Sequence, residues 1–390
     1  MSVNGSLLAR LAVILTVFVL IAGVATTLRA QEVPAAERIL PETDVVRFFT
    51  PASGALFAVR SHSVPSPTSV QLLRSDDGGA SWRTVELPPA ADRNERRAVT
   101  VDPRDHTVLY ASGAEGLYKS DDDAASWRPI LPTDGPTAEI AVSGADNHLV
   151  YAAVATGRES AAPYQILRSR DGGASWDSLF GVPCTRASLF PHATDAARVV
   201  AALACGPDLP PALYISSDQG TTWSPSADWP EGEASGFRSS TGPMVLAGAG
   251  ARPERSFAAF SLLGSGDGIP LFRTDDAGAT WRQVIVGPRE EVAPASPKWQ
   301  GGKLWAYISA LEDDPSNPDR LYVGLRGSSQ PLRTSADGGE TWTALPLPSD
   351  LRNVVAVALG VDRRNLYVST IYGTYARGTE GVYRVPLSAP

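Results

Sequence analysis

Six copies of one short pattern constrain the fold of this chain more than any other feature of its sequence. Each copy reads Ser/Thr-x-Asp-x-Gly-x-Ser/Thr-Trp between two short apolar runs, and the copies begin at Ser75, Ser120, Ser169, Ser216, Thr274 and Ser335. An Asp carboxylate accepts backbone N–H groups within its own turn, glycine adopts positive φ at little cost, and tryptophan offers a large apolar surface for burial. Each copy therefore predicts a turn between two antiparallel strands.

The aspartate and the tryptophan of each copy are expected to hold and pack these turns. They are Asp77 and Trp82, Asp122 and Trp127, Asp171 and Trp176, Asp218 and Trp223, Asp276 and Trp281, and Asp337 and Trp342. The second copy departs from the pattern, because Ala124 stands where the other copies have glycine. A β-carbon disfavours positive φ, so the second turn is expected to be strained or altered.

The spacing between copies indicates a repeat architecture. Successive aspartates are 45, 49, 47, 58 and 61 residues apart, with strand-like sequence between them. Periods of this size are typical of β-propeller blades of four strands each. The copies are identified as Asp boxes, also called BNR repeats, and the chain resembles the sialidase-like superfamily of Asp-box β-propellers. That superfamily includes sialidases, xyloglucanases, sortilin-type receptors and photosystem II assembly factors, so the resemblance implies a fold but no single function.

The predicted fold is all-β, a seven-bladed β-propeller over residues 43–390. The seventh unit ends after its third strand, near Gly381–Val385, so its outer strand has to come from elsewhere. Residues 31–42 form a linker in which Glu37–Leu40 is the available closing strand, which would remove an exposed edge. The first strands of the seven units are expected at Val45–Thr50, Ala98–Val101, Glu139–Val142, Ala187–Phe190, Met244–Ala247, Leu304–Ala310 and Val354–Leu359.

Residues 1–30 are predicted to be a signal peptide or a membrane anchor. Arg10 precedes a run from Leu11 to Leu28 that carries no charge. This run is long for a secretory signal and just long enough to cross a bilayer at about 1.5 Å per residue. Ala25 and Ala30 offer small residues at cleavage points. The propeller is therefore expected to be extracytoplasmic, either secreted or anchored to the membrane by this segment if it stays uncleaved.

The charge of the chain limits its partners. A formal net charge of −8 and an isoelectric point of about 5.2 argue against nucleic acid as a partner, because no basic excess is available to displace counterions from phosphates. The four histidines, His62, His106, His148 and His192, fall in different units without a second ligand at suitable spacing. No metal or other cofactor is expected.

The only two cysteines, Cys184 and Cys205, both fall in the fourth unit. If its first two strands pair about a turn at Thr194–Asp195, Phe190 faces Val199 and Cys184 faces Cys205. Facing positions bring sulfurs within bonding distance, and an exported protein can be oxidised. The sequence thus predicts a disulfide, with two buried free thiols as the alternative.

The resemblance implies that the Asp boxes lie on the face of the ring opposite its ligand-binding mouth, which loops on the other side form. Loop residues with flat aromatic or guanidinium groups can stack on sugars, bind carboxylates or anchor a protein. For the tryptophans among them, the alternative is that each only covers the end of the ring. The candidate ligand-binding residues are Trp229, Trp299, Arg158, Arg377, Tyr372 and Glu380.

Two function classes follow from these candidates. A sialidase would require three arginines, a Tyr–Glu pair and an Asp, but the Arg-Ile-Pro signature is not matched, since Arg38–Pro41 carries an extra leucine. Tyr372 and Glu380 could stand in for the Tyr–Glu pair. A xyloglucanase-like pair of acids could come from Glu115, Asp208, Asp267 and Glu380. We expect an exported, non-catalytic propeller that binds a protein or a glycan through its mouth, with a glycoside hydrolase as the alternative.

Overall fold

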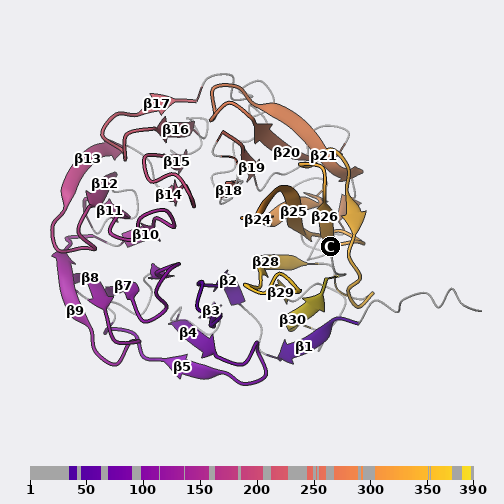
Figure 1. Cartoon of the computed structure of the whole chain (residues 1–390), viewed down its shortest axis with the longest axis horizontal. Helices are drawn as coiled ribbons and strands as arrows, with labels where there is room; N and C mark the ends of the chain where they lie inside the picture. Colours follow the sequence, from indigo (N-terminus) through magenta and orange to yellow (C-terminus); the bar gives the residue numbers. More distant parts are fainter. Residues whose placement is uncertain are drawn as a thin grey trace, which may run out of the picture. The chain divides into compact units, whose positions relative to one another are not determined.

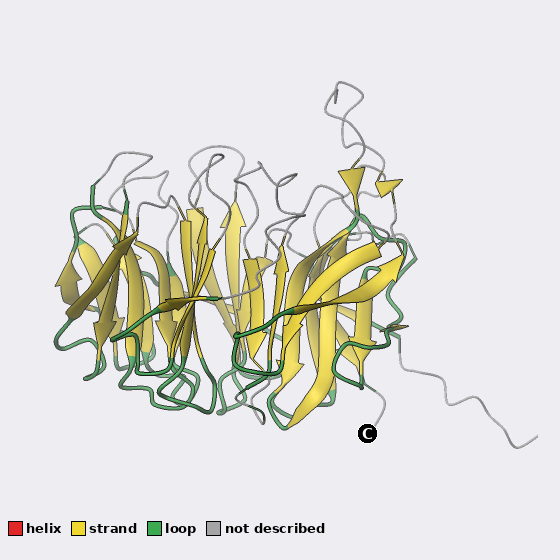
Figure 2. Ribbon diagram, turned by 90° about the horizontal axis from the view of Figure 1, so that it is seen from above, coloured by secondary structure: helices red, strands yellow, loops and turns green. Residues whose placement is uncertain are grey.

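A computed structural model describes residues 35–41, 45–62, 69–89, 98–113, 115–135, 137–157, 163–182, 186–204, 212–226, 244–248, 252, 254–260, 268–288, 291–292, 304–349, 351, 353–370 and 380–387. Over these residues the regular elements are all β-strands (Figure 2). Within these described residues, no helix is long and apolar enough to cross a membrane. Residues 1–30, with the predicted signal peptide or anchor, lie outside it.

Seven four-stranded antiparallel sheets form the blades of a ring (Figure 1). Blades 1 to 3 contain β2 (Val45–Phe49), β3 (Leu56–His62), β4 (Ser69–Ser75), β5 (Arg83–Val85), β6 (Val99–Val101), β7 (Leu109–Gly113), β8 (Gly116–Ser120), β9 (Arg128–Pro132), β10 (Thr137–Val142), β11 (Val150–Ala155), β12 (Tyr164–Ser169) and β13 (Asp177–Val182). Blades 4 to 6 contain β14 (Arg186–Pro191), β15 (Val199–Ala204), β16 (Ala212–Ser216), β17 (Ser224–Pro225), β18 (Met244–Gly248), β19 (Ser256–Phe260), β20 (Gly268–Thr274), β21 (Arg282–Pro288), β24 (Tyr307–Asp314), β25 (Asn317–Arg326), β26 (Leu332–Ser335) and β27 (Thr343–Ala344). The prediction of a seven-bladed all-β propeller is confirmed.

The seventh blade closes the ring with strands from both ends of the described chain. It contains β28 (Val354–Leu359), β29 (Asn365–Thr370), β30 (Gly381–Pro386) and, as its outer strand, β1 (Glu37–Leu40). β1 pairs antiparallel with β30, with Glu37 opposite Arg384, and the side chains of these two residues form an ion pair. The other six blades use consecutive strands only, so this pairing is what joins the two ends.

The hydrophobic core lies in the seams between neighbouring blades. Buried apolar side chains form a cluster at each of the seven seams. Alternation along a strand explains this arrangement, since successive side chains point to opposite faces of a sheet. On β3, for example, Leu56 and Ala58 pack against blade 7, whereas Phe57 and Val59 pack against blade 2. Each blade is therefore buried on both faces.

Two local expectations differ from the structure. Leu304–Trp305 belongs to a separate short strand, β23, which pairs with β22 (Glu291–Val292), and the first strand of blade 6 begins only at Tyr307. In blade 4, Phe190 pairs with Val200 instead of Val199, because the hairpin turns between His192 and Arg198. The register on which the disulfide prediction was based is thus wrong by one residue. Cys184 and Cys205 themselves lie outside the described residues.

Candidate functional site

The direction of the strands separates the propeller into two faces. Within each blade the first strand leads into the second at one face of the ring, and in blades 1 to 6 the third strand leads into the fourth through an Asp box at the same face. We call this the Asp-box face. The opposite ends of the strands, with the connections from second to third strands and between blades, form the mouth face, and Figure 2 shows the strands running between the two.

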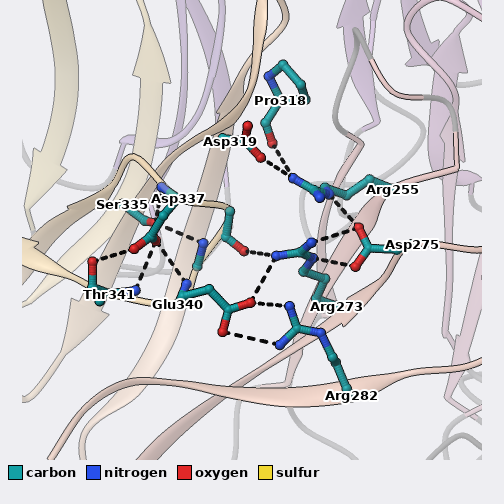
Figure 3. Close-up of polar contacts among 12 residues, drawn as sticks. Arg255, Arg273, Asp275, Arg282, Pro318, Asp319, Ser335, Asp337, Glu340 and Thr341 are labelled. Atoms are coloured by element: carbon teal, nitrogen blue, oxygen red, sulfur yellow. Dashed lines mark hydrogen bonds and ion pairs between the residues drawn. The ribbon is translucent and has the colours of Figure 1, made fainter.

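Each Asp box uses its carboxylate inside its own turn. In the third box, Asp171 accepts hydrogen bonds from the backbone N–H of Ser175 (2.8 Å) and from the hydroxyls of Ser175 (2.6 Å) and Ser169 (2.8 Å). These hydrogen bonds lower the pKa of Asp171 to about 2, and the bond from the Ser175 hydroxyl contributes most. The same contacts recur around Asp337 in the sixth box (Figure 3). A carboxylate held in this way is suited to structure and not to proton transfer.

The second box shows how the chain accommodates the missing glycine. Ala124 has φ of 65° and the preceding Asp123 has φ of 60°, both in the left-handed region that disfavours a β-carbon. The hydrogen bond from the Ala124 N–H to the Ser120 hydroxyl is kept at 2.9 Å. The Trp127 indole, however, donates to the carbonyl of Glu86 (3.0 Å) instead of to its own box. The turn is expected to be strained or altered; the positive φ of Ala124 confirms the strain, whereas the hydrogen bonds of the turn match those of the other boxes.

Arginines join neighbouring boxes on the Asp-box face. Arg273 of blade 5 donates to the carbonyl oxygen of Gly338 in the sixth box at 2.9 Å, and Arg282 forms an ion pair with Glu340 (Figure 3). Arg168 of blade 3 likewise reaches the carbonyl of Gln219 in the fourth box at 2.6 Å. The box tryptophans are half-buried and pack against the same seams. This face is thus a framework of satisfied contacts.

Two of the expected mouth residues are described. Glu380 lies just before β30 and is buried, with only 7% of its surface exposed. Glu115 is exposed in the tight turn between β7 and β8. The other candidates lie outside the described residues: Trp229, Trp299, Arg158, Arg377, Tyr372, Asp208 and Asp267. The structure therefore neither brings these candidates together nor separates them.

The first strands of three blades contain charged groups that the sequence reasoning missed. Arg47 on the first strand of blade 1 and Glu139 on the first strand of blade 3 form an ion pair at 2.8 Å. Glu312 on the first strand of blade 6 accepts the N–H of Leu359 at 3.2 Å. Burial raises the pKa of Glu312 to about 8, and the charge of Asp313 adds to this rise. The only sequence signal that could have identified these residues was the presence of a charged residue within an otherwise apolar first strand.

The histidine and metal expectations can be compared with the described residues. His192 is buried, and its Nδ1 accepts the N–H groups of Thr194 (3.2 Å) and Asp195 (3.1 Å), so it caps a turn on the Asp-box face. Burial lowers the pKa of His192, which favours this neutral acceptor. Within the described ranges, no three His, Cys, Asp or Glu side chains gather in a way that could hold a metal ion.

The fold and the boxes define the class, which is a seven-bladed Asp-box β-propeller. The model of the BNR/Asp-box repeat matches residues 214–225, the fourth box. Xyloglucanase Xgh74A of Acetivibrio thermocellus is 24% identical over 316 residues, covering 65% of this chain and 36% of that protein. A xyloglucanase of a Paenibacillus species is 26% identical over 325 residues, covering 65% and 29%. The solved structure of an ancestral GH74 enzyme shares the fold with a TM-score of 0.55 at 14% identity, covering 90% of this chain and 47% of that one.

These relatives correct the functional expectation. The expected non-catalytic binding role is wrong, because curated proteins that match most of this chain are named xyloglucanases. The glycoside hydrolase alternative fits better. This chain spans about a third of the length of those relatives. The absence of the sialidase signature does not count against a xyloglucanase-like pair of acids, because two carboxylates on separate loops leave no local pattern in a sequence.

Proposed function

We propose that this chain is a glycoside hydrolase that acts on xyloglucan or a related β-glucan at its mouth face. The observation that carries the proposal is the alignment with named xyloglucanases along 65% to 72% of the chain. An alignment of this extent covers several blades, so it reflects more than the shared turn of the Asp box. Because the chain covers only part of those relatives, its activity needs its own test.

The chemistry requires two carboxylates on either side of the glycosidic bond. One acts as the general acid, and the other as the nucleophile at about 5–5.5 Å or as the general base at about 6.5–9.5 Å. The Asp-box aspartates are unsuited to this role, because they lie on the opposite face and their carboxylates accept hydrogen bonds within their own turns. Glu139 is engaged by Arg47. Glu380 is our first candidate, because it is buried at the mouth, where exclusion of water favours catalysis.

The second carboxylate is proposed to be Glu115, Asp208 or Asp267, which the chain order places on mouth loops of blades 2, 4 and 5. Trp229, Trp299, Tyr372, Arg158 and Arg377 are proposed to contact the glycan. Aromatic rings present flat apolar faces to sugar rings, and arginines donate to hydroxyl or carboxylate oxygens.

We also propose that residues 1–30 direct export or anchor the chain, so that the propeller acts outside the cytoplasm on a polysaccharide. Polysaccharides are extracellular substrates, and the uncharged run from Leu11 to Leu28 supports this assignment. Export would permit a Cys184–Cys205 disulfide. Mass spectrometry of the protein from separated cell fractions tests both proposals. An intact N-terminus found only in the cytoplasmic fraction would contradict export, and two free thiols in the exported protein would contradict the disulfide.

The activity is tested by incubating the full chain with xyloglucan and measuring the release of reducing ends. We expect release that Glu380→Gln lowers by at least about a hundredfold, the usual range for loss of a general acid. Glu115→Gln, Asp208→Asn and Asp267→Asn identify the second carboxylate. Asp146→Asn is the matched control, because Asp146 caps a turn on the Asp-box face where asparagine makes the same contacts. A folded chain inactive on xyloglucan and on other β-glucans refutes the proposal.

A further inference from the structure

Two half-buried arginines at the mouth face have no acidic partner among the residues that the structure describes. Arg60 has a buried Nε atom without a hydrogen-bond partner, and its guanidinium makes no ion pair with any residue that the structure describes. Arg326 contacts the Tyr307 ring, 5.9 Å from its centroid, and has no acidic partner within the described chain. On the Asp-box face, by contrast, Arg168 and Arg273 bind carboxylates and carbonyls.

Arg60 lies at the seam between blades 7 and 1. It follows Leu56 and Ala58 at two-residue spacing on β3, and both of those residues pack against blade 7. Arg60 pairs across the sheet with Val45, whose carbonyl oxygen accepts the hydroxyl of Ser369 from blade 7 at 2.7 Å. The alternation of β3 therefore directs Arg60 toward blade 7.

Arg326 lies at the seam between blades 6 and 7 and occupies the equivalent position. It pairs with Tyr307, the first residue of β24, as Arg60 pairs with the first residue of β2. Gly324, two residues earlier on the same face, lies so close to Val354 of blade 7 that a β-carbon would come within 2.3 Å of it. The Arg326 backbone also forms a β-bridge with Asn353, just before β28. Arg326 thus approaches blade 7 from the opposite side.

The mouth end of blade 7 is therefore flanked by two cations and contains one buried acid. Thr370 and Glu380 are buried polar residues of this end, with 0% and 7% of their surfaces exposed. Arg38 on β1 also lies there, with its guanidinium next to Gly381. Taking a guanidinium out of water without a partner costs free energy, which an anion bound from solution would recover. Planar guanidinium forks match carboxylate oxygens in a bidentate geometry.

We propose that the mouth end of blade 7 binds an acidic glycan, with Arg60 and Arg326 each holding one carboxylate group of its uronic acid residues. The inference rests on the proposed glycoside hydrolase function and deepens it, because it assigns acidic decoration to the polysaccharide recognised at the mouth. Tyr307, beneath Arg326, offers an aromatic face for the adjoining sugar ring. Sulfate groups present similar oxygens, so the test includes a sulfated glycan.

The test is calorimetric titration of the full chain with hexagalacturonate, a carrageenan hexasaccharide, which is sulfated and contains no uronic acid, a neutral xyloglucan oligosaccharide and hexaglutamate, at low salt and at 0.5 M NaCl. We expect hexagalacturonate to bind, and Arg60→Gln or Arg326→Gln to weaken its binding by about ten- to a hundredfold, as for loss of a charge-assisted hydrogen bond. Lysine at either position should restore part of the affinity. Arg83→Gln, on the Asp-box face, is the matched control and should bind as the unchanged chain does.

Each outcome discriminates. A melting temperature of Arg60→Gln that equals or exceeds that of the unchanged chain supports the assignment, because an unpaired cation does not stabilise the fold. Binding of the neutral oligosaccharide without binding of hexagalacturonate overturns this inference and leaves the proposed function standing. Tighter binding of the sulfated glycan, or equally tight and arginine-dependent binding of hexaglutamate, overturns the uronic acid assignment. Equal losses in the Arg83→Gln control overturn the site.

Discussion

Replacing Glu312 by glutamine should stabilise the propeller above pH 5. Glu312 resists ionisation in the folded chain, where burial raises the pKa of its carboxyl from 4.5 to about 8. In the unfolded chain this carboxyl ionises near its ordinary value, so folding has to return a proton to it at intermediate pH. The contribution of the neutral carboxyl is fully present below pH 4.5 and is lost as the pH rises toward 8.

The magnitude follows from the shift. Each unit of pKa difference corresponds to about 1.4 kcal/mol, so the unchanged chain loses about 3 kcal/mol between pH 4.5 and pH 7 and about 4 kcal/mol by pH 8. Glutamine stays neutral at every pH and can still accept the Leu359 N–H. Glu312→Gln should therefore match the unchanged chain at pH 4.5 and exceed its free energy of unfolding by about 2–4 kcal/mol at pH 8.

Urea unfolding followed by tryptophan fluorescence at pH 4.5, 7 and 8.5 measures this difference directly. The difference between variant and unchanged chain cancels the titration of all other groups, including the Asp boxes. Glu115→Gln is the matched control, because Glu115 is exposed and should show no such gain. A constant difference across the pH range, or a less stable variant at pH 8.5, would refute the reasoning.

Three further predictions concern the Asp boxes. Ala124→Gly should raise the free energy of unfolding by about 0.5–1 kcal/mol, because it relieves a φ of 65°, and chemical denaturation measures this. Trp176→Ala should lower the free energy of unfolding by about 2 kcal/mol. This is less than the ~3–5 kcal/mol for a fully buried aromatic residue, because Trp176 is only half-buried. Glycan binding per folded molecule should be unchanged. Acid should destabilise the fold between about pH 4 and pH 2, as a circular dichroism titration can measure. The ionised box carboxylates, whose pKa values are depressed to about 2 in the case of Asp171, contribute their full stability only above this window. Full stability at pH 2 would contradict this.

The sequence predicts those parts of the fold that depend on local chemistry and on repetition. The boxes could be located because Asp, Gly and Trp act within one turn, and the missing glycine at Ala124 predicted positive φ at a disfavoured residue. The pairing of Glu37–Leu40 with the seventh blade followed from a count of strands, since one blade lacked its outer strand. None of these inferences required knowledge of distant contacts.

The rest depends on contacts between distant residues. The Arg47–Glu139 ion pair joins blades 1 and 3. The two residues are 92 positions apart, and no spacing pattern in the sequence predicts their contact. Arg60 and Arg326 became notable only when the seams showed that both approach blade 7. The register of blade 4 depended on the turn from His192 to Arg198, where a shift of one residue moves every pair. Catalytic carboxylates on separate loops are unpredictable for the same reason.

Hydrolysis of xyloglucan at the mouth is tested most directly by measuring cleavage and binding together for the unchanged chain and for Glu380→Gln. Glutamine keeps the size of the side chain but cannot donate the proton that a leaving group requires. We predict that the unchanged chain releases reducing ends from xyloglucan, whereas Glu380→Gln binds the polysaccharide with similar affinity and releases at least about a hundredfold fewer. Binding by the unchanged chain without any cleavage, or cleavage by Glu380→Gln at the full rate, would contradict the account.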